Sequence, residues 1–107
     1  MTAYCHKLNT MNQLLINEYI QWSEATFGQE YYLNVLMKLR SDEIWELRDA
    51  MVLKDRENQA EELADCFLLL FKIAHLNGFN ISDIEQAMAM KLIELHNRKF
   101  VDGKRIK

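Results

Sequence analysis

The sequence of 107 residues contains no proline, only three glycines and only two cysteines. The scarcity of proline and glycine excludes collagen-like repeats and a loop-rich scaffold. Cys5 and Cys66 are too few for a disulfide framework, and their spacing is not that of a zinc site. Half of the residues are hydrophobic, which excludes a disordered chain. This composition predicts an all-α globular protein, and the length predicts a single domain over residues 1–107.

Long hydrophobic runs are also absent from the sequence. The longest unbroken apolar run covers residues 66–71, which is far too short to cross a bilayer. The opening stretch, MTAYCHKLNT, lacks the apolar segment of a signal peptide. We therefore expect a cytoplasmic protein that has no membrane partner.

Excess positive charge is missing as well. The formal net charge is −3, which disfavours nonspecific nucleic-acid binding as the main function. Basic residues gather only near the carboxyl end: Arg98, Lys99, Lys104, Arg105 and Lys107. We interpret residues 101–107 as a solvated, partly frayed basic tail. The alternative interpretation places Arg98 at an anion site.

Hydrophobic periodicity and helix-end residues predict four helices, over about residues 11–26, 31–53, 58–76 and 82–99. Three residue pairs resemble N-terminal caps: Thr10 with Gln13, Asn58 with Glu61, and Ser82 with Glu85. Gly28 and Gly78 follow two of the predicted ends, where a left-handed residue is favoured. The short connections predict antiparallel neighbours, and hence a compact four-helix bundle whose core lies within residues 10–100.

The predicted third helix is apolar on two faces. Leu63, Phe67, Leu70 and Ala74 lie opposite much of its first apolar stripe. A helix that is apolar on most sides is buried on most sides, and so small a chain has little core to cover it. We therefore expect a homo-oligomer.

Two acidic pairs interrupt otherwise apolar helix faces. Glu62 and Asp65 share a face with Cys66, Leu69 and Ile73 when the third helix is wound at 100° per residue. The second helix repeats the pattern, because Glu43 and Glu46 fall within its apolar stripe. Residues three apart on a helix have Cβ atoms roughly 5–6 Å apart, so each pair of carboxylates can converge. The short turn between these helices allows all four to meet.

A divalent cation explains the position of these acids. Unpaired buried carboxylates lose hydration at a cost of several kcal/mol per ion, and a cation removes that penalty. Ligands that are all oxygen favour Mg²⁺ or Mn²⁺ over zinc. A di-iron centre needs Glu-x-x-His pairs, and neither His75 nor His96 has a glutamate three residues before it. The alternative for each acidic pair alone is an ordinary solvated helix face.

The fourth predicted helix adds positive charge. Lys91 and Arg98 lie on its apolar stripe, facing the presumed core. Beside an acidic metal cluster, these cations suit a polyphosphate, since the metal and the cations together neutralise its oxygens. The alternative is a lysine whose apolar stem crosses the core surface while its ammonium reaches water.

The acidic motifs Glu43-x-x-Glu46 and Glu62-x-x-Asp65 resemble those of the MazG-like nucleoside triphosphate pyrophosphohydrolases, an all-α family. Four stretches carry the resemblance: WSEATFG at 22–28, LRSDEIWEL at 39–47, EELADCFLLLFKIAHLNGF at 61–79 and KLIELHNRKF at 91–100. One position departs from the family, because Leu95 stands where relatives often have asparagine. The polar side chains nearest to it in sequence are His96 and Asn97.

The resemblance implies hydrolysis of an NTP or dNTP to the monophosphate and pyrophosphate, with Mg²⁺, by attack of water on the α-phosphorus. It also implies a homodimer or homotetramer that clears unwanted nucleotides from the pool. The alternative is a non-catalytic helical binding or adaptor protein, also oligomeric, whose acids form a structural ion site.

The residues divide into three sets of candidates. The expected metal ligands are Glu43, Glu46, Glu62 and Asp65. The expected catalytic residues are Glu61 and Glu46, either of which could orient the attacking water, and Lys91, which would steady the leaving pyrophosphate. The expected substrate contacts are Lys91, Arg98 and Asn97, with Trp22 or Phe27 stacking on the base. For Trp22 and Phe27, packing in the core is the alternative.

Overall fold

The computed structural model describes residues 3–106, and the side chains from residue 12 onward. The predicted all-α class is confirmed. The elements are α1 (Ala3–Phe27), α2 (Tyr32–Lys38), η1 (Leu39–Glu43), α3 (Ile44–Leu53), α4 (Arg56–Leu76), α5 (Ile81–Asn97), β1 (Lys99–Val101) and β2 (Lys104–Ile106). Segment η1 is a π-helical turn that joins α2 and α3 into one rod, since its flanking residues keep right-handed helical backbone angles. In the part of the chain described, no helix is long and apolar enough to cross a membrane.

All the predicted helix boundaries except the first hold to within two residues. In chain order, the four predicted helices correspond to α1, to the rod that α2, η1 and α3 form together, to α4 and to α5. Gly28 (φ 76°) and Gly78 (φ 86°) adopt the left-handed conformation expected after a helix end. The predicted start at residue 11 is wrong, because the backbone is already helical from Ala3.

Helices α4 and α5 are capped by residues other than those predicted. The Asp55 side chain accepts a hydrogen bond from the Asn58 backbone N–H (3.3 Å), so α4 begins before the predicted cap. Asn80 and Asp83 form a reciprocal capping box with two 2.9 Å hydrogen bonds, so the predicted Ser82 cap is wrong. The true caps lie three and two residues earlier, and each offers a side-chain oxygen to the backbone amide three residues later.

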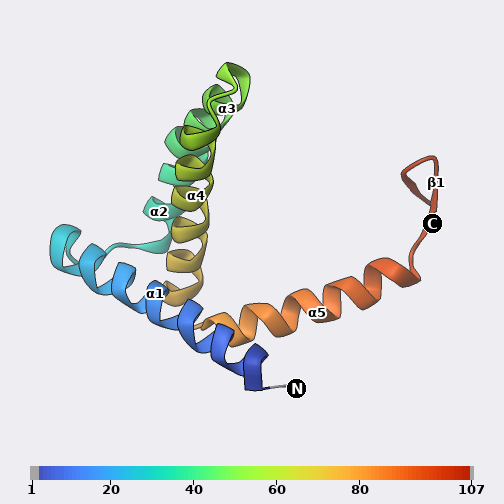
Figure 1. Ribbon diagram of the computed structural model, residues 1–107, viewed down its shortest axis with the longest axis horizontal. Helices are drawn as coiled ribbons and strands as arrows, with labels where there is room; N and C mark the ends of the chain where they lie inside the picture. The colour runs from blue at the N-terminus through green and yellow to red at the C-terminus, as the bar shows by residue number, and fades with distance from the viewer. Residues whose placement is uncertain (1–2, 107) are drawn as a thin grey trace.

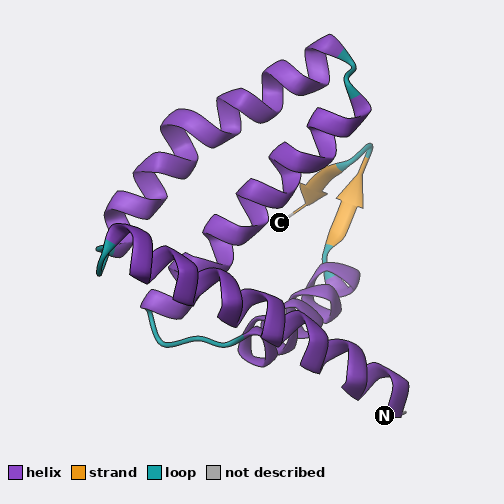
Figure 2. Cartoon of the chain, turned by 60° about the vertical axis from the view of Figure 1, so that its left-hand side comes forward, coloured by secondary structure: helices purple, strands orange, loops and turns teal. Residues whose placement is uncertain are grey.

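The rod and α4 run antiparallel and are joined by a tight turn at one end (Figures 1 and 2). Between them lies the first core cluster: Val35, Leu39, Cys66 and Leu69, with Leu47, Ile73 and Leu76 packed against it. A second cluster lies where α1 meets α4 and the start of α5: Ile16, Ile20 and Ile81, with Tyr19, Leu68 and Phe71. Burial raises the pKa of the Cys66 thiol, in keeping with its predicted packing role.

The single chain is not the compact four-helix bundle that was predicted. Helix α5 packs on α1 near its start and then extends away from α3 and α4 (Figure 1). The radius of gyration is 16.7 Å, against about 13 Å for a compact domain of 100 residues. Large apolar side chains on α5 remain exposed, among them Met88, Leu92 and Ile93. The apolar stripe of α5 is real, but no other part of the described chain covers it.

The basic carboxyl end forms a hairpin instead of the predicted frayed tail. Strands β1 and β2 pair antiparallel, with Val101 opposite Lys104 (Figure 2). Asp102 and Gly103 at the turn both have positive φ angles, which suit a tight hairpin. All six strand residues are exposed.

Candidate metal centre

The π-helical turn η1 determines the direction of Glu43. Along the rod, inward positions recur every four residues at Val35, Leu39 and Glu43, a spacing wider than the 3.6 residues of an α-helical turn. A π-helical turn absorbs one extra residue and keeps that face toward α4. Glu43 therefore continues the buried stripe of Val35 and Leu39 without a break.

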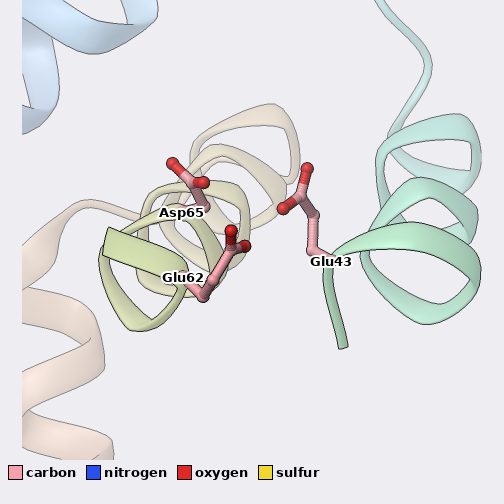
Figure 3. Close-up of side chains that lie close together, drawn as sticks. All are labelled: Glu43, Glu62 and Asp65. Atoms are coloured by element: carbon pink, nitrogen blue, oxygen red, sulfur yellow. The ribbon is translucent and has the colours of Figure 1, made fainter. Parts of the chain in front are cut away.

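Three carboxylates converge between η1 and α4. Glu43 extends from η1, while Glu62 and Asp65 come from successive turns of α4, and the three carboxylates lie close together where these elements meet (Figure 3). One oxygen from each lies within 4.8 Å of the others. A cation bound at 2.0–2.6 Å by two oxygens separates them by at most about 5 Å, so the spacing fits a single hard cation. Glu43 and Glu62 are partly buried, and Asp65 is exposed.

The electrostatics of the cluster favour a bound cation. Burial, then a hydrogen bond and repulsion from Glu46, raise the pKa of Glu43 to about 7. Burial followed by the charges of Glu46 and Asp65 raises the pKa of Glu62. Within the described chain, the Oε2 atoms of both Glu43 and Glu62 are buried without a hydrogen-bond partner. Buried carboxylate oxygens normally have a hydrogen-bond partner. A hard divalent cation bound to both Oε2 atoms would take the place of these partners.

Glu46 lies beside the cluster rather than within the converging set. Its side chain is exposed, although it is close enough to raise the pKa of both Glu43 and Glu62. Glu61 is also exposed, and its charge raises the pKa of Glu62 less than burial, Glu46 and Asp65 do. The structure thus brings three of the four predicted ligands together and leaves the fourth at the edge.

A cavity of about 160 Å³ adjoins the carboxylates. It is lined by Tyr19, Trp22, Phe27, Lys38, Glu43, Asp65, Leu68 and Leu69. We call it the aromatic pocket. Trp22 and Phe27 meet edge to face with ring centroids 5.6 Å apart, and they are 56% and 54% exposed. The alternative that they are ordinary core residues is therefore wrong for the single chain.

Lys38 is a component of the aromatic pocket that the sequence did not predict. Its Nζ lies 5.5 Å from the centre of the Phe27 ring, and it lines the same cavity as Glu43. In the sequence Lys38 is indistinguishable from any exposed helix lysine, since only the fold of the 28–31 connection brings α1 over it.

The predicted cations of α5 are not near the carboxylates within one chain. Lys91 Nζ lies 2.9 Å from a Glu94 oxygen, and Arg98 pairs with the other oxygen of the same carboxylate. These hydrogen bonds from Lys91 and Arg98 lower the pKa of Glu94. Asn97 is exposed at the end of α5, where the helix points away from α4 (Figure 1). The prediction that Lys91 and Arg98 face the acids is wrong for the single chain, because α5 does not fold back along α4.

A family model described as the MazG nucleotide pyrophosphohydrolase domain matches residues 32–100, which is more than half of the chain. The chain belongs to the MazG family. The predicted resemblance is therefore confirmed, and it places the protein in a family of nucleoside triphosphate pyrophosphohydrolases that is generally metal-dependent. No curated protein and no solved structure matches the chain significantly.

The MazG match covers the whole carboxylate cluster, from η1 through α4, and ends at Phe100. It begins with α2, so Trp22 and Phe27 precede the matched region. One wall of the aromatic pocket is therefore supplied by a helix outside the MazG match.

Proposed function

We propose that this protein is a Mg²⁺-dependent pyrophosphohydrolase that converts a nucleoside triphosphate, in particular a dNTP, to the monophosphate and pyrophosphate. The observation that carries the proposal is the convergence of Glu43, Glu62 and Asp65 in a MazG domain, where two of these residues have a buried oxygen with no partner among the described residues. The physiological role would be removal of unwanted nucleotides from the cytoplasmic pool.

The three converging carboxylates would hold the metal, and their oxygen-only set suits Mg²⁺ or Mn²⁺. When bound, the metal would neutralise phosphate charge and make water a better nucleophile. Water attacks the α-phosphorus, the bond to the α–β bridging oxygen breaks, and pyrophosphate leaves with that electron pair. Glu46 is better placed than Glu61 to accept the proton of the water, since it lies closer to the other acids.

The aromatic pocket would receive the nucleoside next to the metal. Trp22 and Phe27 give the cavity an aromatic lining for a base, and Lys38, over the Phe27 ring, adds a positive charge to the cavity that Glu43 also lines. A cavity that combines aromatic rings with a lysine and carboxylates suits a nucleotide, which has an aromatic base and a charged phosphate chain.

Trp22→Ala is expected to raise KM about tenfold with little change in kcat, because loss of base stacking costs about 1–3 kcal/mol. Trp45→Ala is the matched control, since Trp45 is similarly exposed but lines a separate groove on η1 and α3. Steady-state kinetics of both variants provide the measurement. An unchanged KM in Trp22→Ala, or an equal rise in both variants, would contradict the assignment of the pocket.

A homodimer or homotetramer would complete the site. The exposed apolar side chains of α1, α4 and α5, including Leu15, Phe67 and Leu92, leave wide surfaces for a second copy. In this arrangement, the triphosphate bound to one copy would be contacted by Lys91, Arg98 and Asn97 of a neighbouring copy. Within one chain these residues do not lie near the carboxylates.

The decisive assay identifies the products from a panel of the eight common NTPs and dNTPs, with Mg²⁺ and with EDTA. We expect pyrophosphate and a nucleoside monophosphate from at least one member with Mg²⁺, and none with EDTA. Release of orthophosphate alone would contradict the proposed reaction. Absence of any turnover would instead favour the non-catalytic adaptor with a structural ion site.

A further inference from the structure

Among the side chains that the structure describes, the most deeply buried charged one lies outside the carboxylate cluster. Lys72, in the middle of α4, is 2% exposed, and its Nζ contacts the Ser23 hydroxyl and the Glu30 carboxylate. Ser23 is itself 1% exposed, and its hydroxyl lies 3.5 Å from Glu30 Oε1. We call these three residues the lysine anchor. It was missed in the sequence, although a lysine within the apolar run LLLFKIAHL is the same kind of anomaly as the acids.

The lysine anchor joins three segments that are separate in sequence. Lys72 belongs to α4, Ser23 to the last turns of α1, and Glu30 to the connection between α1 and α2. The chain reverses between the last two at Gly28, whose φ is 76°. Phe27 lies between Ser23 and Glu30 in sequence, and its ring centre is 6.0 Å from the Lys72 Nζ. The ammonium therefore lies against Ser23 and Phe27 of α1 and against Glu30 of the following connection.

The same helix carries the anchor and the metal ligands. Lys72 follows Asp65 by seven residues, which places it on the same face of α4 about 10 Å along the axis. A buried ion pair is often no more stabilising than well-packed apolar residues of similar volume, so stability alone does not explain Lys72. Its position is specific, because Ser23 directly follows Trp22, Phe27 lies between Ser23 and Glu30, and both aromatic residues line the aromatic pocket together with Glu43 and Asp65.

We propose that Lys72, held by Ser23 and Glu30, is a positioning residue that sets the distance between the aromatic wall and the carboxylates, and so determines affinity for the nucleoside. This inference rests on the proposed function, and it adds a specificity role for a residue that does not itself line the pocket. It assigns the anchor to substrate binding and not to cleavage of the phosphoanhydride.

Lys72→Met is expected to raise KM at least fivefold while kcat changes less than twofold. Glu30→Gln, at a side chain that is 27% exposed, serves as the second variant if Lys72→Met folds poorly, with an expected KM rise of about threefold. The double variant should raise KM no more than Lys72→Met alone, since both changes break one network. A merely structural role would lower the folded fraction and kcat without moving KM, and that result would overturn the proposal.

Fluorescence separates failure of this inference from failure of the proposed function. Trp22 and Trp45 are the only tryptophans, so Trp45→Phe leaves Trp22 as the single reporter. In that background, Lys72→Met should change acrylamide quenching of Trp22 in nucleotide-free protein. If wild type hydrolyses no nucleotide but quenching changes, Lys72 still positions the aromatic wall, while the proposed function and the role in nucleoside affinity both fail. If wild type is active while KM and quenching are unchanged in Lys72→Met, the positioning role is wrong.

Discussion

Glu62→Gln is expected to lower kcat at least about 1,000-fold, since the metal supplies several kcal/mol of transition-state stabilisation and each 1.4 kcal/mol is a factor of ten. The same variant should leave the metal-free protein as stable as wild type or more stable. Glu62 is partly buried beside Glu46 and Asp65, and its Oε2 is buried without a hydrogen-bond partner in the described chain. Removing its charge relieves repulsion and desolvation together.

The two effects are measured by steady-state kinetics with Mg²⁺ and by thermal unfolding in EDTA. Glu57→Gln is the matched control, because Glu57 is exposed in the first turn of the same helix and lies outside the cluster. It should keep wild-type turnover. Marked destabilisation of metal-free Glu62→Gln would show that Glu62 supports the fold and would contradict its assignment as a metal ligand.

Turnover at limiting Mg²⁺ is expected to fall as the pH drops below 7, by about 25-fold between pH 7.5 and pH 5.5 if one proton competes with the metal. The pKa of Glu43 is raised to about 7, first by burial and then by Glu46. A protonated Glu43 cannot act as an anionic ligand, so protons and metal compete for the cluster. Raising the Mg²⁺ concentration should therefore move the midpoint to lower pH, which the pH profile at several concentrations will show.

The stability of the metal-free protein is expected to change with pH in the opposite direction. The pKa of Glu43 is about 7 in the folded state and near 4.5 when unperturbed, so between these values the folded state binds more protons. Stability is therefore greatest below pH 4.5 with respect to this group and is lost as the pH rises to 7. After allowance for solvent access, the loss is on the order of 1 kcal/mol, or about 4 °C in Tm.

The control for this pH dependence is Glu43→Gln, in which the loss of Tm between pH 4.5 and 7 should shrink. Mg²⁺ should restore the Tm of wild type near pH 7.5 but not that of Glu43→Gln. Thermal unfolding across this pH range, in EDTA and in Mg²⁺, is the measurement. An equal response to Mg²⁺ in both proteins would place the stabilising ion elsewhere.

The acidic residues show which side-chain directions helical periodicity predicts and which it does not. Glu62 and Asp65 lie on a regular helix, so winding at 3.6 residues per turn places them correctly. On the rod, the same winding predicts Glu46 in the inward stripe, yet Glu46 is exposed. The π-helical turn η1 contains one extra residue, which changes the direction of the side chains that follow it relative to a regular α-helix. Nothing in the sequence LRSDE predicts such a turn. Helical periodicity therefore locates the acidic cluster but does not identify which of the carboxylates converge.

The sequence does not predict where α5 packs. Its apolar stripe identifies which face needs covering, but the stripe does not say whether the same chain or another copy covers it. The sequence therefore placed Lys91 and Arg98 beside the acids, whereas within one chain both pair with Glu94 of the same helix. Lys38 and Lys72 acquire their positions from contacts distant in sequence, which helical periodicity does not encode.

The most direct test of the proposed metal centre is the anomalous scattering of crystals grown with Mn²⁺. We expect a manganese peak within about 2.5 Å of carboxylate oxygens from Glu43, Glu62 and Asp65 together. Clear density for these three side chains without a manganese peak between them, or a peak bound only elsewhere, would contradict the proposed metal centre.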